Sequence, residues 1–214
     1  MSADLSIVIA VRDGAEWIEA AVRSASGADG LLEIVVVDDG SHDDGAELAL
    51  GASDAVRVLR RPPRGLPAAH NVGVGAARGE LLAFLDADDR WSASTPDPRR
   101  ELLGGADAVL GRIQCVAAGE PHGEPFHNGG IAGLLVRREV LDRVGPFDEG
   151  LQHGHDLDWY LRARERGLNI PRSEAVVLHY TLRPDSLSDG PQGRAAQGLL
   201  AALARSRRRR GSAA

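Results

Sequence analysis

Three carboxylates within four positions follow a short apolar segment near the middle of the chain. Leu81 to Leu85 is apolar throughout, and Asp86, Asp88 and Asp89 come directly after it. Alternate side chains of an extended segment point to the same side, so the carboxylates of Asp86 and Asp88 can converge on one point. A hard divalent ion suits such oxygen ligands, and Mg²⁺ or Mn²⁺ bound this way usually also holds a substrate's phosphates. The alternative is an acidic turn that caps the next helix.

The elements that must position these carboxylates alternate between strand and helix in the first half of the chain. We expect strands at 5–11, 34–37, 55–60 and 81–85, and helices at 14–26, from 43 onward and at 67–77. This alternation is typical of βαβ units, and predicts an α/β fold with a mixed, mostly parallel sheet and helices on both faces. Ligands bind at the carboxyl ends of the strands in such sheets.

A second acidic pair, Asp38 and Asp39, follows the strand expected at 34–37. Both acidic groups therefore lie at carboxyl ends and should face one crevice. A carboxylate away from a metal can accept hydrogen bonds from a nucleobase or from ribose hydroxyls, so the two groups can have separate roles. A strand-ending turn that caps the following helix is the alternative for Asp38 and Asp39.

Composition narrows the class of protein. All 25 basic residues among the 214 are arginine, which excludes chemistry that needs a lysine, such as a Walker-type phosphate site or a Schiff base. The formal charge of −6 argues against a nucleic-acid-binding protein. The chain has one cysteine, Cys115, no leader-like start and no apolar run of about 18 residues that could span a membrane. We expect a soluble, cytoplasmic protein.

Four motifs of the first half together resemble a family 2 glycosyltransferase of the GT-A fold. They are Ser6–Ile9 before a helix, Glu33–Ser41, Gly65 through Asn71 to Gly73, and Gly79–Asp89. In the second half, Gly145–Glu149 and then His153–Arg162 are similar to the family's GxFDE segment and to its acidic motif at the head of a helix. The resemblance implies an inverting enzyme that takes a sugar from a nucleotide diphosphate sugar and uses a divalent metal, Mn²⁺ or Mg²⁺.

The same resemblance implies roles for individual residues. Asp38 and Asp39 would contact the base or ribose and Asp86 the ribose, Asp86 and Asp88 would hold the metal and diphosphate, and Asp156 would be the general base. Asn71 and Arg183 fall in segments that contact the donor, and Asp89 would support its neighbours. Uracil is the base that the resemblance favours, giving a UDP-linked donor. The donor sugar and the acceptor stay open, whether glycan, lipid-linked molecule, peptide or small molecule.

Four positions depart from the family pattern, one of them being Thr181, which replaces a frequent arginine. His155 replaces the acidic residue that usually precedes the base, and His70 stands where an arginine is frequent. Arg183 replaces a histidine that can reach metal or diphosphate; an arginine cannot ligate a metal but can clamp phosphate with several donors. His179 is the only nearby histidine that could substitute.

Other interpretations of these residues stay open. Asp156 could cap a helix, and Asn71 could serve helix packing. The set His153, His155, Asp156 and Asp158 could bind a transition metal. A non-catalytic protein that binds a nucleotide sugar or a partner is a rival from another class, and a sugar-phosphate nucleotidyltransferase shares the architecture.

The second half is expected to be less regular, and we treat the chain as a single domain. Segment 92–100 is expected as a loop, 106–110, 113–116 and 131–136 as strands, and 138–144 as a helix. We divide the chain into a GT-A domain at 1–190, with a nucleotide-sugar half (1–89) and an acceptor half (90–190), and a C-terminal helix with a basic tail at 191–214. Without a long extra domain, the acceptor site must be shallow or be completed by a partner or a second copy in a homodimer.

The basic run Arg205–Arg210 follows helical apolar spacing. It is expected to be a frayed, solvated end or to touch an anionic membrane surface.

Overall fold

The first half of the chain forms the expected alternation of strands and helices. The computed structural model describes residues 4–92, 97–151, 153–183 and 194–211. Its first elements are β1 (Leu5–Val11), α1 (Ile18–Ala25), β2 (Leu31–Asp38), α2 (Gly45–Ala52), β3 (Val56–Arg60), α3 (Leu66–Ala76) and β4 (Leu81–Phe84). The acidic groups thus follow β2 and β4, as the sequence predicted.

The second half varies more in element length, from two-residue strands to an 18-residue helix. Its elements are β5 (Arg90–Trp91), α4 (Pro98–Leu102), the 3₁₀ turn η1 (Leu103–Gly105), β6 (Ala108–Ala117), β7 (Glu120–Pro121), β8 (Leu134–Arg137), α5 (Arg138–Val144), α6 (His155–Glu165), β9 (Arg172–Thr181) and α7 (Arg194–Gly211). Within the described residues, no helix is both long and apolar enough to cross a membrane.

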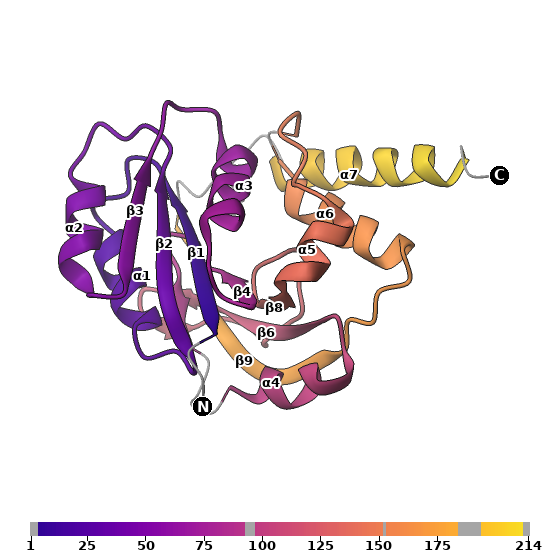
Figure 1. Cartoon of the computed structure of the whole chain (residues 1–214), viewed down its shortest axis with the longest axis horizontal. Helices are drawn as coiled ribbons and strands as arrows, with labels where there is room; N and C mark the ends of the chain where they lie inside the picture. Colours follow the sequence, from indigo (N-terminus) through magenta and orange to yellow (C-terminus); the bar gives the residue numbers. More distant parts are fainter. Residues whose placement is uncertain (1–3, 93–96, 152, 184–193, 212–214) are drawn as a thin grey trace.

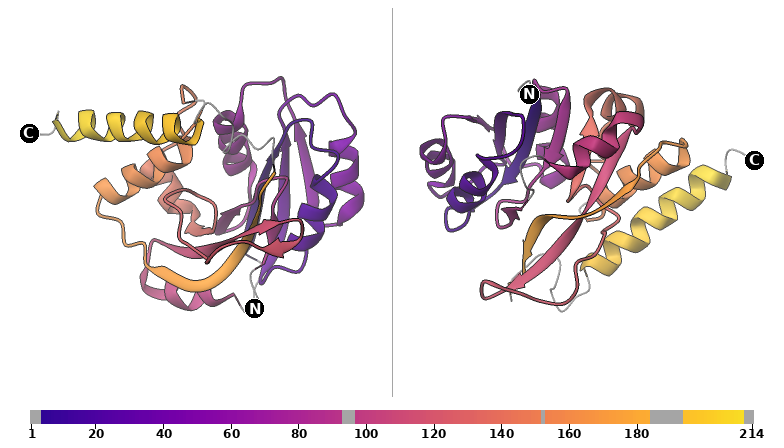
Figure 2. Two further views of the ribbon diagram at one scale, coloured as in Figure 1. Left: turned by 180° about the vertical axis from the view of Figure 1, so that it is seen from behind. Right: turned by 90° about the horizontal axis from the view of Figure 1, so that it is seen from below.

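One mixed sheet joins the two halves. Its strand order is β3-β2-β1-β4-β8-β6-β9-β5, with β7 paired to β6 beside this path. Strands β1 to β4 run parallel, β8 pairs antiparallel with β4, and β6 pairs parallel with β9. Figure 2 shows β6 and β9 side by side, running away from the parallel strands. The carboxyl ends of β1, β2 and β4 therefore share one edge of the sheet.

Both faces of β1, β2 and β4 are largely buried, which explains their nearly continuous apolar sequences, whereas the edge strand β3 is only half-buried. In β1, Ile7 and Ile9 belong to a core that includes Ile18 and Val22 of α1. The alternate residue Val8 belongs to the opposite core, with Ala69 of α3. Helices α1 and α2 thus cover one face and α3 the other, an arrangement that can be followed in Figure 1.

Three parts of the second half differ from the sequence-based expectation. The strands expected at 106–110 and 113–116 form the continuous strand β6, and the strand expected at 131–136 is shorter and ends at Arg137. The segment expected as a loop at 92–100 ends in the start of α4, and the short strand β5 directly before it was not predicted. Strand β9 was not predicted; it mixes polar and apolar residues, and its pairing with β6 depends on contacts distant in the sequence.

Candidate active site

A pocket of about 350 Å³ lies at the carboxyl ends of β1, β2 and β4. Asp39 comes to it from the end of β2, and Asp86 and Asp88 come from the end of β4. Trp17, just before α1, and Tyr180, near the end of β9, contribute aromatic walls. The structure therefore brings together the two acidic groups that the sequence predicted to face one crevice.

The two members of the first acidic pair have different surroundings. The carboxylate of Asp39 accepts hydrogen bonds from the backbone N–H groups of Arg64, at 3.0 Å, and Gly65, at 2.7 Å, and it lines the pocket. Asp38 is not among the lining residues, and its Oδ1 accepts the backbone N–H of Ser41 at 2.8 Å. The turn interpretation thus describes Asp38, whereas Asp39 is in place to meet a ligand.

The carboxylates after β4 crowd one another. Burial, followed by the charges of Asp88 and Asp156, raises the pKa of Asp86 to about 7. Asp89 is 1 % exposed, and burial followed by the charge of Asp86 raises its pKa to about 9. Its Oδ1 accepts the backbone N–H of Thr181 at 2.9 Å, which fastens this turn to the end of β9. Such strongly shifted carboxyl groups in a cleft are typical of functional sites.

A guanidinium group already stands among these carboxylates. Arg183 follows β9, lines the pocket and forms an ion pair with the carboxylate of Asp88. The carbon at the centre of its guanidinium lies 4.1 Å from the ring centroid of Trp17, a cation–π contact. Arg183 is therefore held between an acid and an aromatic ring inside the pocket.

Asp156 lies at the head of α6, beside the acidic group. The N-cap of α6 is Gly154, so Asp156 sits in the first helical turn rather than at the cap. It is half-buried, and its charge contributes to the raised pKa of Asp86. A side chain at Gly130 would collide with it, since an added Cβ would meet Oδ2 of Asp156 at 2.2 Å. A carboxylate at this position interacts favourably with the helix dipole.

Beneath this carboxylate lies a buried pair of histidines. Nδ1 of His70, on α3, lies 3.1 Å from Nε2 of His155, on α6. The two side chains are 2 % and 4 % exposed, and Phe84 and Phe147 pack against the ring of His70. Burial lowers the pKa of both imidazoles, so the pair is held neutral. The two histidines that depart from the family pattern therefore contact each other.

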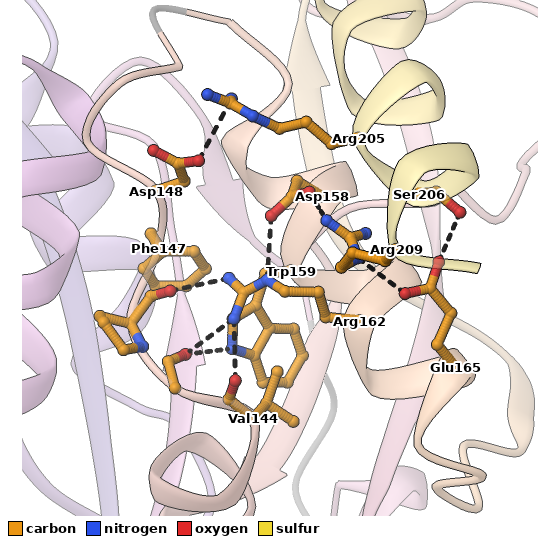
Figure 3. Close-up of polar contacts among 12 residues, drawn as sticks. Val144, Phe147, Asp148, Asp158, Trp159, Arg162, Glu165, Arg205, Ser206 and Arg209 are labelled. Carbon is orange, nitrogen blue, oxygen red and sulfur yellow. Dashed lines mark hydrogen bonds and ion pairs between the residues drawn. The ribbon is translucent and has the colours of Figure 1, made fainter. Parts of the chain in front are cut away.

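Helix α7 packs on α6 through ion pairs rather than projecting as a frayed end (Figure 3). Asp158, 1 % exposed, accepts from Arg162 at 2.9 Å and from Arg209 at 2.8 Å. Arg209 also contacts Glu165 at 2.8 Å. At the other end of this contact, an added Cβ on Gly154 would meet the Gly198 carbonyl oxygen at 2.4 Å. The backbone before Asp156 thus touches α7 directly.

Besides Asp38, the predicted ligand residues Asn71 and His179 lie outside the pocket lining, as does the predicted base Asp156. The Asn71 side-chain amide donates to the Phe147 carbonyl at 2.9 Å, and its oxygen accepts the Phe147 N–H at 2.8 Å. Asn71 thus fastens α3 to the segment before α6. His179 lies 3.1 Å from the Ser92 hydroxyl. Within the described part of the chain, no group of three or more His, Cys, Asp or Glu residues could hold a metal ion.

Comparison with known families decides the classification. The family described as "Glycosyl transferase family 2" matches residues 6–152, more than half of the chain. The chain belongs to glycosyl transferase family 2. This match includes the acidic groups after β2 and β4 but stops before α6, which carries Asp156.

Curated relatives agree with membership of glycosyl transferase family 2. The succinoglycan biosynthesis protein ExoU of Rhizobium meliloti is 30% identical over 221 residues, covering 86% of this chain and 64% of that protein. Glycosyltransferase AglE of Haloferax volcanii is 29% identical, covering 84% of this chain and 67% of that protein. The chain therefore spans about two thirds of the length of these relatives.

Solved structures establish the fold of this family 2 chain. TarS of S. aureus, residues 1–349 in complex with UDP-GlcNAc, superposes with a TM-score of 0.76 at 20% identity. The superposition covers 87% of this chain and 61% of TarS 1–349. The complex of the same TarS fragment with UDP gives a TM-score of 0.73. With the mixed sheet and its flanking helices, this likeness confirms the predicted GT-A-like α/β fold.

Sequence reasoning missed several residues that line the pocket. Trp17 lies within the helix expected at 14–26, and neither it nor Arg12 or Tyr180 was given a role in the site. Trp17 and Arg12 follow β1 closely, so the rule that ligands meet the carboxyl ends of strands could have identified them. Tyr180 could not be identified that way, since strand β9 itself was not predicted.

Proposed function

We propose that the protein is an inverting glycosyltransferase that moves a sugar from a nucleotide diphosphate sugar to an acceptor hydroxyl. The supporting observation is the single pocket that gathers Asp39, Asp86 and Asp88 at the carboxyl ends of neighbouring strands. Family membership agrees with this reaction. The shared edge suits a ligand with two chemically different ends: a nucleoside that donates hydrogen bonds to carboxylates, and a charged diphosphate.

In this proposal the nucleoside lies toward Asp39 and the diphosphate toward Asp88. Asp39 is preorganised because two backbone N–H groups already hold its carboxylate, and Trp17 adds an aromatic wall. The solved structures of TarS contain UDP and UDP-GlcNAc, which supports uracil as the base. The donor sugar depends on loops that differ between relatives.

Asp156 is the proposed general base. An acceptor hydroxyl that attacks the anomeric carbon opposite the leaving nucleoside diphosphate must lose its proton, and a positioned carboxylate can accept it. Asp156 lies in the first turn of α6, where its carboxylate interacts favourably with the helix dipole. Inversion by direct displacement needs no covalent sugar–enzyme intermediate, so the chain needs no nucleophile.

The predicted Mn²⁺ or Mg²⁺ site has suitable oxygen donors, but one of its two carboxylates is already paired with an arginine. Asp86 and Asp88 supply hard oxygen donors, and a bound metal would stabilise the charge of the departing diphosphate. However, Asp88 is paired with Arg183. A divalent ion would therefore have to take Asp88 from Arg183, and substrate phosphates would have to complete its coordination.

Turnover tests the proposed reaction. Release of the nucleoside diphosphate is measured for a panel of UDP-, GDP-, CDP- and TDP-sugars with simple sugar acceptors. Asp156→Asn should lower turnover by about 10²–10⁴-fold while the binding of the nucleoside diphosphate is unchanged, because only proton transfer is lost. Asp142→Asn is the matched control, since Asp142 is exposed on the neighbouring helix α5. If binding occurred without turnover in the parent protein, a non-catalytic nucleotide-sugar-binding role would replace this proposal.

A further inference from the structure

Arg183 is fixed in the pocket from two sides. Its guanidinium pairs with Asp88 and lies against the ring of Trp17 at 4.1 Å. All three residues line the same pocket, and the side chains of Arg183 and Asp88 are only 24% and 25% exposed. A cation held between a carboxylate and an aromatic face loses little further freedom when a ligand arrives.

The Arg183 guanidinium has an N–H donor that is available to an anionic ligand. Arginine carries five N–H donors in a planar fork, a geometry that matches phosphate oxygens. Within the described residues, the buried Nε–H of Arg183 has no hydrogen-bond partner. Such an unpaired buried donor is costly by itself and gains most when an acceptor reaches it. Diphosphate oxygens are acceptors of the required charge.

Arginine supplies the fixed positive charge that the pocket can offer to a diphosphate. The chain contains no lysine, so every fixed cation is an arginine. Among the described lining residues, the cations are Arg12 and Arg183. Of these two, Arg183 is the one paired with a carboxylate expected to bind metal, and it therefore competes with a divalent ion for that carboxylate.

From these contacts we propose that Arg183 is the resident counter-cation for the donor diphosphate, so that a nucleoside diphosphate binds this pocket without a divalent metal ion. This inference rests on the proposed function, because it concerns the same donor site. Arg183 neutralises Asp88 in the empty pocket and shares its remaining donors with the diphosphate when the donor is bound. Loss of the guanidinium frees the Asp88 carboxylate, and a metal ion can then occupy its place.

Binding with and without metal tests the assignment. Calorimetry measures the affinity for UDP, GDP, CDP and TDP in chelator and in Mn²⁺, for the parent protein and for Arg183→Met. Methionine keeps an apolar stem against Trp17 and removes the charge. In chelator, the variant should bind the preferred diphosphate about 10- to 100-fold more weakly than the parent, the loss expected for charge-assisted hydrogen bonds. Mn²⁺ should recover affinity in Arg183→Met and change the parent little.

Two further variants guard the interpretation. Arg183→Lys keeps the charge but loses the planar fork, so its affinity in chelator should be intermediate. Arg164→Ala removes an exposed arginine of α6 far along the helix from Asp156 and should bind like the parent. Thermal unfolding without ligand checks that each variant is folded.

The outcomes separate this inference from the proposed function. Tight binding by the parent in chelator, lost in Arg183→Met and recovered with Mn²⁺, supports the counter-cation role. Binding by the parent only in Mn²⁺, or equal binding by parent and Arg183→Met in chelator, overturns it while the donor site stands. Absence of binding to all four diphosphates in both conditions overturns the proposed donor site, and this inference with it.

Discussion

At the scale of single residues, Asp89 is a buried carboxyl group that joins two parts of the site. Its carboxyl group is almost fully buried next to Asp86, and it holds the backbone of Thr181. Its Oδ2 atom has no hydrogen-bond partner within the described residues. Asp89 thus links the turn after β4 to the end of β9, and the link places Arg183 two residues farther on. Carrying an unpaired buried oxygen is the cost of this connection.

The raised pKa of Asp89 predicts how stability depends on pH. Burial, then the charge of Asp86, raises this pKa to about 9 from an ordinary value of 3.8. The folded protein therefore keeps a proton that the unfolded chain releases above about pH 4, and stability falls as pH rises toward 9. Asp89→Asn keeps the Oδ1 acceptor and removes this titration. At pH 8 the variant should be more stable than the parent by about 1 kcal/mol or more, with the difference fading toward pH 4.5.

Urea unfolding of both proteins across this pH range measures the difference. The slope against pH is the informative quantity, since the two side chains also differ in hydrogen bonding. Parallel curves for parent and Asp89→Asn would show that the Asp89 carboxyl titrates at an ordinary pH in the folded protein.

The histidine pair predicts a pH dependence of the opposite sign. Burial, then the charge on His155, lowers the pKa of His70, and burial lowers that of His155 against the opposing charge of Asp156. Below about pH 6.5 the histidines therefore bind protons in the unfolded chain but not in the folded protein. The free energy of unfolding decreases as pH falls. His70→Phe with His155→Leu removes both groups. The double variant should lose less stability between pH 7 and pH 5 than the parent.

A single replacement is the contrasting control for this pair. His70→Phe alone leaves a buried ring nitrogen of His155 without its partner and should cost about 1–3 kcal/mol at pH 7.5. The double variant should cost less than the sum of its two single changes, because neither ring is then left unpaired. Additive costs would mean that the 3.1 Å contact contributes nothing to stability.

At the scale of elements, helix α7 was only partly predicted. Its apolar spacing indicated a helix, but the arginine run was expected to fray or to meet a membrane. In the structure α7 continues through Arg205–Arg210, because Asp148, Asp158 and Glu165 offer carboxylates to three of these arginines: Arg205, Arg209 and Arg210. Local sequence could not show this, since the acids lie some 40–60 residues earlier.

Arg209 should carry much of the attachment of α7. It bridges Asp158 and Glu165, and Asp158 is buried. Arg209→Met should lower the free energy of unfolding by about 1–2 kcal/mol, less than for a fully buried pair because the Arg209 side chain is 32% exposed. Arg207→Met, an exposed neighbour on the same helix, should change it by less than about 0.5 kcal/mol. Chemical denaturation of the two variants makes the comparison; equal effects would contradict the bridge.

At the scale of the whole molecule, local patterns predicted the first half better than the second. Strands β1, β2 and β4 are short apolar runs and α1 has a clear apolar face, and the acids at strand ends followed from this alternation. Strand β9 and the contact between His70 and His155 depend on residues brought together from far apart. The pocket wall at Tyr180 and Arg183 therefore could not be placed from periodicity alone, although the resemblance had singled out Arg183.

Contacts cross the division at residue 89 between the nucleotide-sugar half and the acceptor half, which were treated as parts of one domain. Strand β4 pairs with β8, so a single sheet crosses the boundary. Arg99 of α4, fully buried, bonds to Asp97 and to the Gly133 carbonyl at 3.0 Å. The backbone N–H of Asp97 donates in turn to Asp29 at 3.1 Å. The other proposed boundary, between residues 190 and 191, lies outside the described residues.

One sheet and two cores shared across the halves predict a single cooperative unfolding transition. Far-ultraviolet circular dichroism and tryptophan fluorescence should give the same urea midpoint, because Trp17 and Trp159 report on different halves of one unit. In native-state hydrogen exchange, the backbone amides of β1 and those of β6 should show opening free energies within about 1 kcal/mol of each other. Separate midpoints, or strong protection in β1 after β6 has opened, would show that the nucleotide half folds by itself. The pocket could then form without Arg183, which the ion pair to Asp88 makes unexpected.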